Sequence, residues 1–157
     1  MMLTLRIIID VMMAITWLLT LEYKILGMAL HEYVGLTLFA CFIVHILLNW
    51  RWFANLTKGT YNTTRLLRTT ANLALIVCII VVIATVPFVS RVVYTNLSGS
   101  LPVGVWKLIK GLHKGAGKLG FVLLVLHVFF HWTYLRNVLG KIFVSKDKDK
   151  ARLANIK

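Results

Sequence analysis

Four histidines lie at matched intervals in two apolar segments of the chain. His31 and His45 are separated by fourteen positions, and so are His113 and His127. Fourteen helical residues advance the chain by about 21 Å and end about 40° short of four full turns, so both members of a pair share one helix face. That rise covers most of the hydrocarbon thickness of a bilayer. The spacing predicts two helices that each carry one histidine toward either side of a membrane.

The composition indicates a membrane protein independently of the histidines. Hydrophobic residues make up 59% of the chain and charged residues only 15%, which is more apolar than a typical soluble domain. Four stretches are long and apolar enough to span a bilayer. They cover roughly residues 7–21, 34–53, 71–89 and 119–138, and Glu22 and Lys24 leave the end of the first one open as far as residue 30. We expect a single transmembrane domain over residues 1–157.

The distribution of charge predicts the orientation. The net charge is +13, but it is not spread as a nucleic-acid-binding surface would be. With the amino terminus inside, twelve of the 18 Lys and Arg residues fall on the inner side. The positive-inside rule therefore predicts that both termini are cytoplasmic. The basic tail, residues 139–157, is expected to lie in solvent near anionic headgroups.

The chain also repeats itself. The pattern H-x3-G-x9-H-x4-W begins at His31 and recurs without a gap at His113. The preceding spans match weakly, with Leu5-Arg6 and Asp10 corresponding to Leu67-Arg68 and Asn72. The repeat units cover about residues 5–53 and 67–138. Two spans per unit give both copies the same membrane orientation. The predicted fold is all-α: a four-helix transmembrane bundle from a tandemly duplicated helical hairpin, with a site between its second and fourth helices.

The pairing of histidines indicates which metal group the site holds. Parallel copies place His31 beside His113 and His45 beside His127. Zinc needs a third or fourth ligand close to each pair, and the sequence shows none at both levels. Haem iron already has four equatorial nitrogens, so two axial imidazoles complete it. We predict two haem b groups, an outer one on His31 and His113 and an inner one on His45 and His127.

Gly35 and Gly117 each follow a histidine by one helical turn, on the same face. Glycine within a helix lowers helix stability by about 1 kcal/mol relative to alanine, so its presence needs an explanation. Room for a flat macrocycle is one reason, and close packing between membrane helices is another. Occurrence in both copies beside a candidate ligand favours the cofactor.

Other polar residues near the inner end have two interpretations each. His131 aligns with Asn49 rather than with a histidine, so we expect a secondary role for it: a propionate contact, a proton path, a quinone contact, or an interfacial histidine. Arg6 and Arg68 either bind propionates of the inner haem or anchor the topology. Asp10 is expected to pair with Arg6 at i,i+4, the alternative being a proton acceptor near a quinone.

The external connection from residue 90 to 112 carries a basic surface. After Pro102, the pattern predicts an amphipathic helix that lies in the outer interface. Its lysines either form a dock for an acidic redox protein or seat the bundle at the headgroups. These lysines are Lys107, Lys110, Lys114 and Lys118.

Paired histidines fourteen residues apart on two helices resemble the di-haem cytochromes b. The small format, with HEYVG…HILLNWRW, is similar to a prokaryotic family of membrane cytochromes of b561 type, related to the cytochrome b subunits of respiratory oxidoreductases. The resemblance covers about residues 5–138. It implies haem ligation by the four histidines and a place in the prokaryotic cytoplasmic membrane. No motif resembles the quinol-oxidation loop of the large cytochromes b.

The predicted function is electron transfer across the membrane, between a quinone pool or cytoplasmic donor and an extracytoplasmic redox partner. The sequence has no flavin or nicotinamide fingerprint, no CxxCH motif and no cluster of iron–sulfur cysteines. Two other classes stay open. One is a self-contained quinol-dependent oxidoreductase of superoxide or ferric iron, and the other is a metal or proton transporter that uses the histidines directly. The sequence does not distinguish a monomer from a dimer or a larger complex.

Overall fold

The chain is all-α in a computed structural model that describes residues 2–94 and 101–154. Four of its helices are long and apolar enough to cross a membrane, which confirms the predicted fold class. The helices are α1 (Met2–Leu21), α2 (Tyr23–Leu26), α3 (Met28–Leu48), α4 (Trp50–Ala54), α5 (Thr63–Val89) and α7 (Val103–Ala154).

The ends of α3 differ from the predicted second span. Gly27 separates α2 from α3 with a positive φ of 79°, a conformation that glycine adopts without steric cost. As a result α3 begins at Met28, ahead of residue 34, and His31 lies in its first turn. At the other end Asn49 interrupts the helix, and α4 continues the chain. The second hairpin starts at Asn62, whose side chain accepts a hydrogen bond from the Arg65 amide at 2.8 Å and so caps α5.

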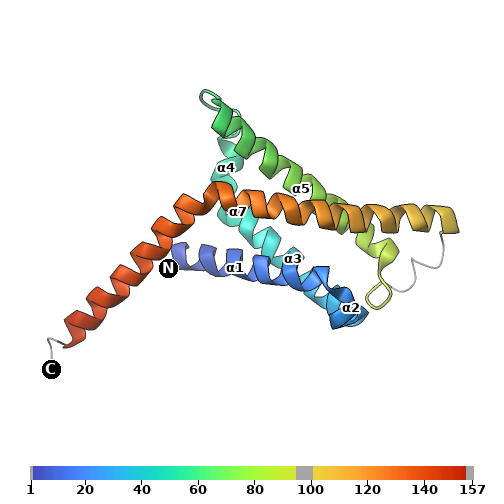
Figure 1. Ribbon diagram of the computed structural model, residues 1–157, viewed down its shortest axis with the longest axis horizontal. Helices are drawn as coiled ribbons and strands as arrows, with labels where there is room; N and C mark the ends of the chain where they lie inside the picture. The colour runs from blue at the N-terminus through green and yellow to red at the C-terminus, as the bar shows by residue number, and fades with distance from the viewer. Residues whose placement is uncertain (1, 95–100, 155–157) are drawn as a thin grey trace.

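The prediction of a separate interfacial helix after Pro102 is wrong. A single helix, α7, begins at Val103 and runs through both that segment and the predicted span. Its glycines each cost only about 1 kcal/mol in a helix interior, and no proline interrupts it, so nothing in the local sequence forces a break. Part of the external connection, residues 95–100, lies outside the described residues. The helix also continues through the predicted basic tail to Ala154, and its last turns extend away from the other helices (Figure 1).

Two helical hairpins make up the structure. In one, α1 packs against α3, and in the other, α5 packs against α7. The helices that carry the histidines, α3 and α7, run in the same direction (Figure 1). A tandem duplication of one hairpin requires this arrangement.

The hairpins meet where α1 contacts α7. Trp17 of α1, only 4% exposed, lies in a core cluster with Leu75 and Ile79 of α5. Gly120 of α7 faces this cluster, and a Cβ atom at that position would lie 2.7 Å from Trp17 Cζ2. Most other large apolar side chains point outward, as expected of helices surrounded by lipid. Cys41 and Cys78 are buried and free.

Candidate functional site

His31 of α3 and His113 of α7 face each other at one end of the bundle. Their ring centroids are 6.4 Å apart, and the ring planes are inclined by 69°. Tyr23 of α2 contacts the His31 ring edge-on, with centroids 6.0 Å apart. The structure therefore brings together the first histidine of each copy, which we call the His31–His113 level.

Both rings at this level are held through Nδ1 by the neighbouring helix. His31 Nδ1 donates to the Thr20 carbonyl of α1 at 2.9 Å. His113 Nδ1 lies 2.9 Å from the Thr85 hydroxyl of α5. That hydroxyl donates its own proton to the carbonyl of Val81 or Val82, which leaves its oxygen to accept from His113 Nδ1–H.

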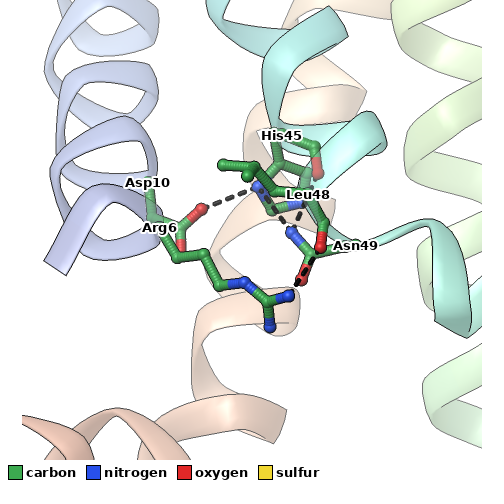
Figure 2. Close-up of polar contacts among 5 residues, drawn as sticks. All are labelled: Arg6, Asp10, His45, Leu48 and Asn49. Carbon is green, nitrogen blue, oxygen red and sulfur yellow. Dashed lines mark hydrogen bonds and ion pairs between the residues drawn. The ribbon is translucent and has the colours of Figure 1, made fainter. Parts of the chain in front are cut away.

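The second histidine of each copy is held in the same way. His45 Nδ1 donates to Asp10 Oδ1 of α1 at 2.7 Å, as Figure 2 shows. His127 Nδ1 donates to Asn72 Oδ1 of α5 at 2.8 Å. The amide nitrogen of Asn49 is 3.5 Å from His45 Nδ1, too far to compete with the carboxylate. We call these two histidines and their supporting side chains the His45–His127 level.

The four acceptors fix one tautomer for all four rings. A carbonyl, a carboxylate and an amide oxygen can only accept a hydrogen bond. The Thr85 hydroxyl already donates its proton to a backbone carbonyl, so toward His113 it too can only accept. Each Nδ1 must therefore carry hydrogen, and each neutral ring keeps its lone pair on Nε2. A histidine that binds a metal through one ring nitrogen usually donates a hydrogen bond from the other nitrogen to an oxygen of this kind.

Two of the four supporting oxygens follow the same repeat as the histidines. Asp10 and Asn72 occupy equivalent positions, and the same offset along the chain places Thr20 opposite Val82. The Thr20 carbonyl supports His31, whereas the hydroxyl of Thr85, and not the residue equivalent to Thr20, supports His113. The repeat thus preserves the supporting position at the His45–His127 level, whereas a different position supplies the support for His113.

The expected pair between Arg6 and Asp10 is wrong. Asp10 instead contacts His45, and Arg6 Nη2 donates to the Leu48 carbonyl at 2.8 Å (Figure 2). The last carbonyls of a helix have no partner within it and carry its negative dipole end. The Arg6 guanidinium reaches this end of α3, which leaves the Asp10 carboxylate to the histidine.

Gly35 and Gly117 have open space beside them. A Cβ atom built on either glycine would find no atom within 4 Å. The packing explanation for these two glycines is therefore wrong in this structure. Gly120, which the sequence analysis did not single out, is the glycine that permits close helix packing.

A polar pocket of about 550 Å³ lies next to the His45–His127 level. Arg68 and Asn72 of α5, His131 of α7 and Arg51 of α4 contribute to its lining, and none of the lining residues is acidic. Arg65 also lines the pocket. Its guanidinium donates hydrogen bonds to the carbonyls of three residues in the preceding loop and so holds that loop in place. The pocket brings Arg68 and His131 together, whereas Arg6 is engaged with Leu48.

His131 is adjacent to the candidate ligands but is held differently. Its ring centroid is 4.7 Å from that of His127. Its Nε2 is buried and has no hydrogen-bond partner among the described residues. The four repeat histidines are supported through Nδ1 by another helix, and this pattern distinguishes them from His131.

The lysines of α7 differ in their surroundings. Lys110 Nζ lies 4.5 Å from the centre of the Trp106 ring, and Lys114 Nζ lies 5.6 Å from that of Tyr23. Lys107 and Lys118 are exposed. All four therefore lie along the part of α7 that approaches the His31–His113 level, with two of them placed over aromatic rings.

Glu32 is a residue that the sequence analysis missed. Its carboxylate accepts hydrogen bonds from the Ser90 hydroxyl and from the backbone amides of residues 91–93, with distances of 2.7 to 3.3 Å. The contact ties α3 of the first hairpin to the end of α5 in the second. Its only signal in the sequence is its place directly after His31.

Comparison of the chain with protein-family models, curated proteins and solved structures finds no match. The functional argument therefore rests on the geometry of the site.

Proposed function

We propose that this chain is a di-haem b-type membrane cytochrome that carries electrons across the bilayer. His31 and His113 would bind the outer haem, and His45 and His127 the inner one. The observation that carries the proposal is the shared support of all four rings through Nδ1. It leaves four Nε2 lone pairs, two on α3 and two on α7, and brings His31 and His113 together.

The ring separation at the His31–His113 level would allow both histidines to hold one iron. A metal–imidazole bond is about 2 Å long and the radius of each ring adds about 1 Å, so two imidazoles bound to one metal would have centroids about 6 Å apart. The observed separation is 6.4 Å.

The space and the ligand number also favour haem over a bare ion. Gly35 and Gly117 leave open volume one turn from a histidine on each helix, where a flat macrocycle needs room. Within residues 2–94 and 101–154, no group of three or more His, Cys, Asp or Glu side chains gathers to hold a metal ion. A bare zinc ion needs three or four protein ligands, whereas haem needs only the two that each level offers.

Haem, when bound, supplies a one-electron carrier at each level. The chain orients the ligands, keeps them in one tautomer, and separates the two levels by about 21 Å along the helices. Arg68 and Arg51 suit the carboxylates of haem propionates, because a guanidinium binds a carboxylate with two parallel hydrogen bonds. The same pocket holds His131, so a propionate would also meet its unpartnered nitrogen.

The distribution of Lys and Arg along the chain supports one orientation of the two histidine levels in the membrane. With both termini in the cytoplasm, the His45–His127 level faces the cytoplasmic side and the His31–His113 level faces outward. Electrons would pass between a quinone pool or cytoplasmic donor and an extracytoplasmic partner. The lysines along α7 would steer an acidic partner to the outer haem.

The test compares two histidines on the same side of the membrane. The full-length His45→Ala variant should lose the inner haem and keep the outer one, as measured by haem content and low-spin spectra. The matched control, His131→Asn, introduces the residue found at the equivalent position 49 and should keep both haems. Two normal bis-histidine haems in His45→Ala would overturn the ligand assignment, and loss of the inner haem in His131→Asn alone would make His131 the ligand.

A further inference from the structure

We infer that Asp10 acts through His45 to lower the reduction potential of the inner haem relative to the same site with a neutral partner. The inference rests on the proposed function and concerns a positioning residue, because Asp10 contacts the ligand and not the iron. It comes from one difference in charge between the two copies.

The asymmetry lies in the charge of the four supporting oxygens. His31 is held by a backbone carbonyl, His113 by a hydroxyl and His127 by an amide, all of them neutral. Only His45 is held by a carboxylate, at 2.7 Å. Asp10 and Asn72 are equivalent in the repeat, so the two ligands of the inner level differ by one charge at matched positions.

A carboxylate on Nδ1 increases the basicity of the imidazole as a metal ligand. The more basic ligand and the nearby negative charge both favour the oxidised, more positive iron, so the potential falls. The side chain of Asp10 is 44% exposed, which allows partial screening of its charge. Arg6 is four residues away on the same helix, but its guanidinium donates to the Leu48 carbonyl (Figure 2), so it reduces the effect of the carboxylate without replacing His45 as its partner.

The chain itself provides the matched substitution. Asn72 shows that an asparagine at this position can hold a histidine through Oδ1 at 2.8 Å. Asp10→Asn should therefore keep the shape and the hydrogen bond while it removes the charge. The mirror variant, Asn72→Asp, should add a charge at the other inner ligand.

The experiment is an optical redox titration of the full-length protein with both haems bound. Asp10→Asn should raise one of the two midpoint potentials by about 59 mV, a tenfold change in the ratio of reduced to oxidised haem. Asn72→Asp should lower the same midpoint, and the double variant should return it toward the wild-type value. The other midpoint, from the outer haem with its neutral partners, serves as the internal control and should not move.

Unchanged midpoints in both single variants, or equal shifts of both haems, would overturn the inference. Should Asp10→Asn lose haem, the Asn72→Asp variant still tests whether a carboxylate on the Nδ1 of an inner ligand lowers the midpoint potential, and an unchanged midpoint there would overturn the inference. A protein that binds no haem in any form would instead overturn the proposed function, so the two failures are distinguishable.

Discussion

Replacement of Gly120 by alanine should destabilise the contact between the two hairpins. The added Cβ would lie 2.7 Å from Trp17 Cζ2, 3.1 Å from Trp17 Cη2 and 3.4 Å from Cys78 Cβ. Trp17 is 4% exposed and packs in the core, so its rigid ring cannot move aside without disturbing its neighbours. Overpacking of this kind typically costs about 1–3 kcal/mol.

Comparison with a matched glycine on the same helix separates the packing cost of the substitution from the effect of helix propensity on stability. Alanine at a helical glycine gains about 1 kcal/mol from propensity alone. Gly115 is exposed, and a Cβ there meets nothing within 4 Å, so Gly115→Ala should show that gain and little else. The difference between Gly120→Ala and Gly115→Ala should therefore equal the overpacking cost, about 1–3 kcal/mol.

The assay is unfolding of both full-length variants in mixed micelles, followed by circular dichroism as the denaturing detergent increases. Gly120→Ala should unfold at a lower fraction of that detergent than Gly115→Ala. Equal stability of the two variants would refute the close approach of α7 to Trp17, and with it the described docking of α1 on α7.

Three further outcomes follow from the same geometry. Glu32→Ala should destabilise the fold by about 2 kcal/mol in the same unfolding assay, because charge-assisted hydrogen bonds to the end of α5 are lost; unchanged stability would mean that this contact does not hold the hairpins together. Charge reversal at Lys107 and Lys110 should slow electron exchange with an acidic partner protein as high salt does, with haem content unchanged; rates insensitive to both treatments would leave these lysines as membrane anchors. Gly35→Leu should fill the open space beside α3 and reduce outer-haem content, and retention of both haems would show that the space is not used.

The transmembrane fold could be predicted from sequence because its signals are local and redundant. Long apolar runs, the distribution of Lys and Arg, and the repeat all indicate the same four spans. The start of α7 could not be read in this way, because the amphipathic pattern after Pro102 is compatible with an interfacial helix and with the first turns of a long span. No local pattern records which of the two forms.

The candidate site was predictable only in its outline. Histidine spacing placed the rings on shared faces, and the repeat paired Asp10 with Asn72, but the sequence did not connect these two residues with His45 and His127. The carbonyl of Thr20 has no side-chain signal at all, since any residue could supply it. Asp10 was assigned to Arg6 because i,i+4 pairs are visible in sequence, whereas the unsatisfied carbonyls at the end of α3 that attract Arg6 appear only once α1 lies beside that helix.

The most direct test of the central claim is the number of haems that one chain binds. The full-length protein, purified from the membrane, should contain two haem b groups per chain, with reduced-minus-oxidised and low-temperature spectra of low-spin iron bound by two imidazoles. Two such groups are what two levels of paired Nε2 atoms predict. A ratio of one would leave one histidine level without the proposed role, and a chain that binds no haem would contradict the account.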